Sequence, residues 1–143
     1  MPWEGLDMTA KLNWLGIIVA TVVAFFLGFL WYGVLFEAIW KELSGVGAEE
    51  GDPMRMMLGL VQTFVTMVGL GWFIARDGAA SWMGGLKIGL VAGVAFALMT
   101  SAYGFIYQTS DLGLLPIDWS HLLVVYSLGG AIIGGLKLKA KTA

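Results

Sequence analysis

The chain has 143 residues, of which 59% are hydrophobic and only 13% are charged, and its mean hydropathy is +0.84. Soluble domains are about 45–50% apolar and about 25% charged, so this composition excludes a water-soluble protein and indicates an integral membrane protein. The net charge of −2 excludes a basic surface for nucleic acid, and the absence of cysteine excludes disulfides, iron–sulfur ligation and thiolate zinc sites.

Four apolar stretches are each suited to cross about 30 Å of hydrocarbon, which takes about 20 helical residues. The uncharged core of the fourth is short, Leu122–Leu136, so we expect its helix to begin near Ile117, with Asp118 and His121 at headgroup depth. The whole chain, 1–143, is therefore predicted to be one all-α membrane domain, a bundle of four transmembrane helices. The predicted spans are residues 15–36, 56–75, 88–107 and 117–136.

The first stretch is predicted to be a retained span rather than a cleaved signal peptide. Only Lys11 supplies positive charge before it, and it ends in Trp31-Tyr32-Gly33, where a signal peptide would have a small-x-small cleavage site.

An amphipathic extension is predicted over residues 37–44. Apolar residues recur there at helical spacing, and Glu37 precedes Lys41 by four residues, as in a helical ion pair. Gly45 and Gly47 are expected to end this helix. Asp52-Pro53 is then predicted to be an N-cap followed by proline in the first helical turn, so the helix of the second span should begin there.

The distribution of basic residues predicts that both termini are cytoplasmic. Six Lys and Arg side chains fall on the side of the termini and only two, Lys41 and Arg55, on the other, and positive charge is retained inside. Tryptophans at both predicted boundaries agree, because indole rings prefer the membrane interface. The six are Lys11, Arg76, Lys87, Lys137, Lys139 and Lys141, and the tryptophans are Trp3, Trp14, Trp72 and Trp82 inside and Trp31, Trp40 and Trp119 outside.

Small residues recur at every fourth position along two spans, which predicts close helix packing. Such ridges serve either the internal bundle or an oligomer interface, and the sequence leaves both open. The ridges are Gly16, Ala20, Ala24 and Gly28 in the first span, and Ser81, Gly85, Gly89, Gly93, Ala97 and Ser101 in the third, with Gly130 and Gly134 in the fourth.

An internal repeat is visible between the first and third spans. Val23-Ala24-Phe25, Leu27 and Tyr32-Gly33 match identical residues 71 positions later, ending at Tyr103-Gly104. This similarity suggests two parallel helix pairs, spans one–two and three–four, related by an axis along the membrane normal. Chance similarity between apolar helices is the alternative.

No ionisable side chain falls in the middle of a predicted span, which argues against a carboxylate proton relay or a voltage sensor. Most mid-span hydroxyls are expected to bond to their own helix backbone. Gln62 differs, because its amide needs a partner on another helix. Interhelical bonding is the expected role of Gln62, and lining a pathway is the alternative.

The densest polar cluster is predicted at the outer mouth. Asp118 and His121 share one face of the fourth span and could form a general-base pair, although a structural role suits them better, since a carboxylate stabilises a helix N-terminus. One histidine without cysteine does not make a conventional zinc site, and no nucleotide-binding, hydrolase or calcium motif is present. We therefore predict no enzyme, no metal and no cofactor. The cluster comprises Tyr32, Glu37, Tyr103, Asp118 and His121, with Tyr107 and Gln108 nearby.

Several of these residues resemble a known family. Asn13-Trp14-Leu15, then Gly28, Trp31-Tyr32-Gly33 and Trp40, together with Ile117-Asp118, are similar to motifs of the bacterial domain of unknown function 1761 family. The resemblance covers about residues 13–136. It implies a small four-helix protein of the bacterial inner membrane and supplies no activity.

Three functions are compatible with these features. The first is a non-catalytic packing or accessory subunit whose partners are the lipid bilayer and copies of itself or other membrane subunits. The second is an oligomeric transporter or channel for a neutral or weakly polar solute, with Gln62 in its pathway. The third is a lipid-binding protein or membrane enzyme that uses the Asp118–His121 region.

Overall fold

The computed structural model describes residues 11–45 and 51–136, and these ranges are built of helices and short connections. Four continuous helical stretches are long and apolar enough to cross a membrane, namely Trp14–Leu35, Pro53–Asp77, Trp82–Tyr107 and Leu112–Gly135. The prediction of four long apolar helices is thus confirmed. The elements are α1 (Trp14–Leu30), π-helical η1 (Trp31–Leu35), α2 (Glu37–Ser44), α3 (Pro53–Asp77), α4 (Trp82–Ala92), π-helical η2 (Gly93–Leu98), α5 (Met99–Tyr107), 3-10 helix η3 (Leu112–Leu114) and α6 (Leu115–Gly135).

Polar caps set where α3 and α4 begin, and this makes both helices longer than hydropathy alone predicts. The Asp52 carboxylate accepts a hydrogen bond from the Met54 N–H at 3.1 Å, so α3 begins at Pro53. The Ser81 hydroxyl accepts from the Gly84 N–H at 2.9 Å. The third span therefore begins at Trp82 rather than at residue 88. Helix α6 has no side-chain cap and begins at Leu115, two residues before Ile117. At the end of α2, Gly45 has a left-handed φ of 67°, as predicted, whereas Gly47 lies outside the described residues.

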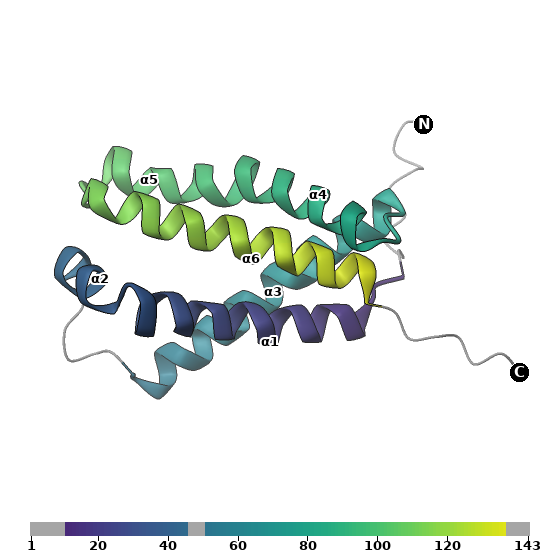
Figure 1. Cartoon of the computed structure of the whole chain (residues 1–143), viewed down its shortest axis with the longest axis horizontal. Coiled ribbons are helices and arrows are strands. Elements are labelled where there is room, and N and C mark those ends of the chain that lie inside the picture. The colour runs from purple at the N-terminus through teal and green to yellow at the C-terminus, as the bar shows by residue number, and fades with distance from the viewer. Residues whose placement is uncertain (1–10, 46–50, 137–143) are drawn as a thin grey trace, which may run out of the picture.

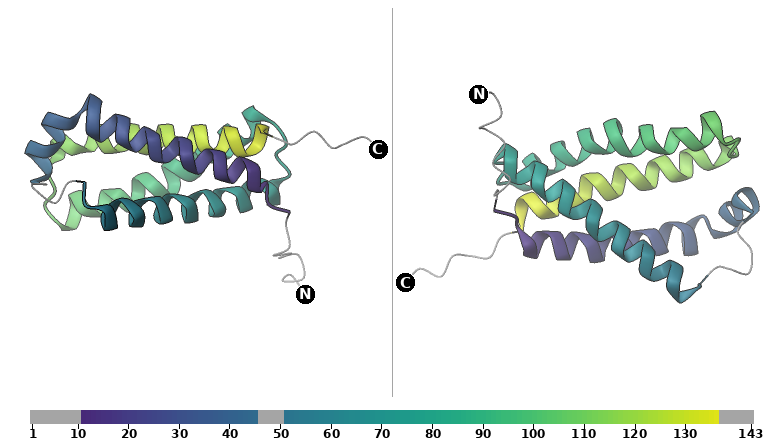
Figure 2. Two further views of the ribbon diagram at one scale, coloured as in Figure 1. Left: turned by 90° about the horizontal axis from the view of Figure 1, so that it is seen from below. Right: turned by 180° about the vertical axis from the view of Figure 1, so that it is seen from behind.

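In the bundle, α6 lies between α1 on one side and α4–α5 on the other, and both run antiparallel to it (Figure 1). Helix α3 crosses diagonally over α1 and α6 on one face (Figure 2). We call the end of the bundle that holds α2 and the start of α6 the α2 end, and the opposite end the Asn13 end. Most of the buried core lies where α3 crosses, with Ile17, Met67 and Ile133 almost fully buried.

Helices α4 and α6 touch through their backbones along the small-residue ridge. A methyl group added at Gly85 would overlap the carbonyl oxygen of Gly130, and one added at Gly89 would overlap that of Tyr126. A methyl group at Gly134 would lie 2.5 Å from the Ser81 carbonyl oxygen. Farther along the ridge, the Trp119 indole N–H donates to the Ser101 hydroxyl at 2.8 Å. The ridge of the third span therefore faces α6 from Ser81 to Ser101, while Ala97 is half-buried within η2.

The ridge of the first span also lies within the chain's own bundle. Gly16, Ala20 and Ala24 are buried, and a Cβ at Gly16 would lie 2.9 Å from the Cα of Ile133. Gly28 continues the ridge toward His121. Of the two alternatives that the sequence leaves open, these contacts are those of the internal bundle.

Asn13 joins the start of α1 to the end of α6. Its side-chain amide donates to the carbonyl oxygens of Ile133 at 2.8 Å and Leu136 at 2.5 Å, while its Oδ1 accepts from the Gly16 N–H at 3.1 Å. One side chain thus satisfies backbone groups at a helix N-terminus and at a helix C-terminus, which otherwise lack partners.

Asn13→Ala is expected to lower the free energy of unfolding by about 2–4 kcal/mol, since an N-cap contributes about 1 kcal/mol and each further hydrogen bond about 1 kcal/mol. Asn13→Ser keeps a cap acceptor but is too short to reach the two carbonyl oxygens, so it should fall between Asn13→Ala and the wild type. Thermal unfolding in detergent measures both. An unchanged midpoint for Asn13→Ala would contradict the bridging role.

The two predicted helix pairs are packed differently. Helices α1 and α4–α5 run in the same direction (Figure 1), as the repeat hypothesis requires. The α4–α6 pair is closed by glycines, whereas α3 diverges from α1 toward the α2 end (Figure 2). The buried residues of α3 begin only at Met67, and its first turns expose Met54, Met56 and Met57. This divergence leaves space between α1, α3 and α6.

Candidate functional site

A cavity of about 550 Å³ opens between the halves of α1 and α3 that lie toward the α2 end, with α6 at its base. This volume lies within the range of about 300–1,000 Å³ typical of small-molecule sites. Its walls combine apolar side chains, such as Phe25, Phe29 and Met56, with a few polar groups. The polar or amphipathic lining residues are Tyr32, Trp40, Asp52, Arg55, Gln62, Thr63 and His121.

A π-helical turn directs the aromatic residues of α1 toward α6. In η1 the Phe36 N–H donates to the Trp31 carbonyl oxygen at 2.9 Å, five residues back. Such π-turns are frequent at functional sites. Here the turn lets Trp31 and Tyr32, although adjacent in sequence, both contact the same ring of α6, that of His121.

Hydrogen bonds fix both aromatic side chains on α6. The Trp31 indole N–H donates to the Ile117 carbonyl oxygen at 3.2 Å and to the Ser120 hydroxyl at 3.3 Å. The Tyr32 hydroxyl donates to Asp118 Oδ1 at 2.8 Å. Trp31, predicted as part of an interfacial belt, is thus also a bonded contact between α1 and α6.

His121 lies at the centre of this arrangement. Its ring meets Tyr32 edge-on at a centroid distance of 5.0 Å and Trp31 at 6.1 Å. Its Nε2 is buried and has no hydrogen-bond partner among the described residues. Gly28 of α1 lies beside this nitrogen: a Cβ there would be 3.7 Å from Nε2, an ordinary van der Waals distance. An imidazole nitrogen can donate or accept, according to its tautomer, so Nε2 retains the capacity for one hydrogen bond.

The structure brings together three of the five residues of the predicted outer cluster. Tyr32, Asp118 and His121 meet, with Tyr32 bonded to the carboxylate and in ring contact with the imidazole. Glu37 instead pairs with Lys41 at 2.5 Å. Tyr103 is 61% exposed and contacts Tyr107, with ring centroids 4.6 Å apart. The described residues contain no group of three or more His, Cys, Asp or Glu that could hold a metal.

Gln62 occupies a different place from the one we expected. Its side chain is exposed and makes no hydrogen bond to another helix within the described ranges, so the prediction of interhelical bonding is wrong there. Instead Gln62 lines the cavity together with His121. The neighbouring hydroxyls behave as predicted, because Thr63 donates to the Gly59 carbonyl oxygen at 2.8 Å and Thr66 to that of Gln62 at 2.9 Å. Sequence periodicity gave no signal that Gln62 and His121 share one cavity, because their proximity depends on the diagonal course of α3.

The comparisons with known proteins give one match. The model of a family described as "Protein of unknown function (DUF1761)" matches residues 15–134, which includes the cavity and both small-residue ridges. Searches of curated proteins and of solved structures gave no match.

Proposed function

The chain belongs to the DUF1761 family, as its motifs predicted, and because that description states no activity we propose from the geometry that it binds an amphipathic molecule of the bilayer. The binding site is the cavity between α1, α3 and α6. No reaction is proposed for it.

The observation that carries this proposal is the buried, unpartnered His121 Nε2 in the wall of a largely apolar cavity. Buried polar atoms are almost always hydrogen-bonded, so such an atom needs an explanation. Apolar walls with a few convergent polar groups are typical of small-molecule sites. A molecule with a polar group for His121 and an apolar body would fit both features.

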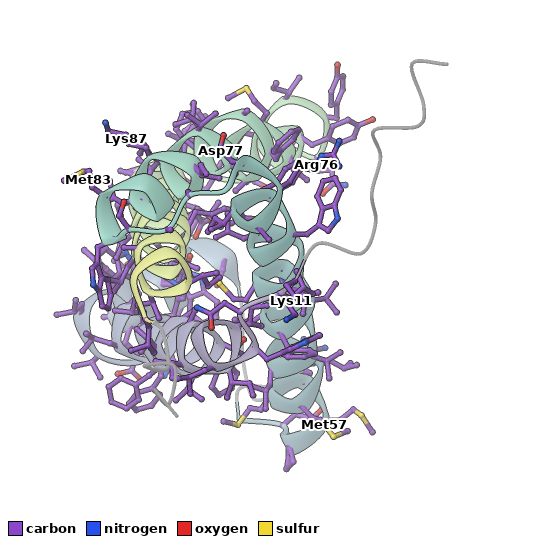
Figure 3. The ribbon with its side chains drawn as sticks, turned by 90° about the vertical axis from the view of Figure 1, so that its right-hand side faces the viewer. Lys11, Met57, Arg76, Asp77, Met83 and Lys87 are labelled. Carbon is purple, nitrogen blue, oxygen red and sulfur yellow. The ribbon has the colours of Figure 1, made fainter. Side chains whose placement is uncertain are left out.

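The proposal includes a place in the bacterial inner membrane, with the Asn13 end in the cytoplasm. Among the described cations, Lys11, Arg76 and Lys87 lie at that end (Figure 3), and Lys41 and Arg55 belong to α2 and the start of α3. The remaining predicted inner residues, Lys137, Lys139, Lys141 and Trp3, lie outside the described residues. The cavity would then open toward the outer leaflet.

Single-cysteine labelling tests this orientation, because the chain has no cysteine of its own. Leu112→Cys, at the α2 end, should react with a membrane-impermeant maleimide in intact cells. Ala80→Cys, between α3 and α4, should react only after lysis. The cysteine-free parent is the control, and the reverse labelling pattern would contradict the orientation.

Filling the cavity tests the proposed function. A Cβ at Gly59 meets only Phe25 Cε2, at 3.8 Å, so Gly59→Leu can enter the cavity without a backbone clash. A ligand at 100 times its Kd stabilises the folded state by about 2.7 kcal/mol. We therefore expect an extract of the native membrane lipids to raise the Tm of the delipidated wild type by several degrees, but not that of Gly59→Leu.

Ala95→Leu is the matched control, because it places the same leucine side chain at an exposed position outside the cavity. It should respond to the extract as the wild type does. An equal rise in the Tm of all three proteins would mean that lipid acts on the outer surface, and this would overturn the proposal.

A packing or accessory subunit is the second candidate. Both small-residue ridges pack inside the bundle, so they no longer support an interface with a partner. The exposed start of α3 does support one. Met54, Met56 and Met57 are all at least half exposed, and flexible methionine side chains suit adaptable binding surfaces. A defined oligomer or hetero-complex after mild extraction would support this candidate, and a single chain would oppose it.

A further inference from the structure

We infer, on the premise that the proposed function holds, that the bound molecule is a long-chain amphiphile with an uncharged, hydrogen-bonding head, and that its chain passes beneath α3 into the groove between α3 and α4. The inference rests on three smaller hollows that share lining residues with the cavity and with one another, and on the order of their linings.

The first step is the passage beneath α3. A hollow of about 140 Å³ shares Gln62, Thr63 and His121 with the main cavity and extends to Val125 and Tyr126 of α6. It lies just before Met67, the first buried residue of α3, which packs on α6 at Gly129. The passage is therefore bounded by the point where α3 comes into contact with α6.

The second step is the exit on the other side of α3. A hollow of about 220 Å³ shares Thr66 and Tyr126 with the passage and adds Ala92 and Phe96 of the third span. A last groove of about 330 Å³ shares Ala92 and Phe96 with it and ends near Lys87. Phe96 stacks on Phe73 of α3 at a centroid distance of 6.2 Å, and both rings line these last two hollows.

The lining changes from polar to apolar along this course. The passage carries the amide of Gln62, the imidazole of His121 and the phenol of Tyr126, and its lining contains no Asp, Glu, Lys or Arg. This set suits a hydroxyl, carbonyl or amide head. Beyond it the groove is lined by Phe73, Phe96 and other apolar residues up to Lys87. An apolar second half would oppose passage of a hydrophilic solute, so the course suits an amphiphile better than a transport pathway.

Photolabelling tests the inference with a long-chain fatty alcohol that carries a diazirine either beside its hydroxyl or at its terminal carbon. In wild-type protein in lipid nanodiscs, the head label should mark peptides around Gln62 and His121, and the terminal label should mark the α4–η2 peptide around Phe96. Labelling of the same peptides by both probes would overturn the inference.

A block in the groove gives the discriminating variant. Nothing lies within 4 Å of a Cβ at Gly69, which lines the hollow beyond the passage, so Gly69→Phe can fill that hollow. It should abolish terminal labelling at Phe96 and leave head labelling at His121. Persistence of the terminal label would overturn the inference while the proposed function stands. If Gly59→Leu leaves the head label unchanged, the proposed function itself fails.

Discussion

Gly85→Ala is expected to lower the free energy of unfolding by up to about 2 kcal/mol, and Gly85→Leu to yield little folded protein. A Cβ at Gly85 would overlap the Gly130 carbonyl oxygen and would lie 3.0 Å from the Cα of Gly134. Both atoms are backbone, so α4 and α6 can relieve the overlap only by separating. Overpacking of this kind typically costs about 1–3 kcal/mol, and here it opposes the gain of up to about 1 kcal/mol that alanine brings to a helix.

Gly69→Ala is the matched control for this prediction, because Gly69 also lies within a long helix but a Cβ there meets nothing within 4 Å. It should leave the Tm in detergent unchanged or raise it by a few degrees. If Gly85→Ala and Gly69→Ala have the same Tm, the close backbone contact of α4 and α6 is wrong.

His121→Phe is expected to weaken binding of the amphiphile by roughly 5- to 150-fold, because an unsatisfied or lost buried hydrogen bond costs about 1–3 kcal/mol. Phenylalanine keeps a ring against Trp31 and Tyr32 and removes only the nitrogens. The unfolding midpoint of the delipidated protein should therefore change little. The measurement is the concentration of purified ligand, or of the fatty alcohol, that gives a half-maximal rise in Tm.

His121→Gln separates the hydrogen bond from the ring. Its amide can still donate and accept in the cavity, so binding should recover in part while the ring contacts are lost. Equal binding by the wild type, His121→Phe and His121→Gln would show that the nitrogen takes no part in recognition.

Hydropathy and local signals were sufficient to predict the long helices and many of their ends. The capping residues Asp52 and Gly45 act where they were expected. Hydropathy alone did not predict the early start of α4, because Lys87 lies in its second turn and lowers the local hydropathy. The helix begins earlier, at Trp82, where Ser81 caps it. A charged side chain near the membrane interface does not end a helix, because the backbone hydrogen bonds of the helix form whether or not that side chain is charged.

The candidate site could be predicted only in part. Spacing predicted Asp118 and His121 on one face of the fourth span, and Tyr32, from the end of the first span, contacts both. Glu37 is satisfied locally by Lys41, four residues later. Tyr103 points away because Ser101, two residues earlier, faces α6, and residues two apart lie on nearly opposite faces of a helix.

Two tertiary features of the site, the π-helical turn and the divergence of α3, could not be predicted from local sequence. The π-helical turn at Trp31–Leu35 aims Trp31 and Tyr32 at one ring, and the divergence of α3 opens the cavity. Both depend on how α1 and α3 meet α6. The internal repeat pointed the other way, because it suggested equivalent helix pairs, whereas only the α4–α6 pair is closed by glycines.

Native mass spectrometry of the protein, extracted from its own membrane in a mild detergent, tests the central claim most directly. We expect the wild type and Ala95→Leu to retain one amphiphile of defined mass per chain, and Gly59→Leu to carry none. The same bound mass on Gly59→Leu, or a bare wild-type chain under conditions that preserve its fold, would contradict a binding site between α1, α3 and α6.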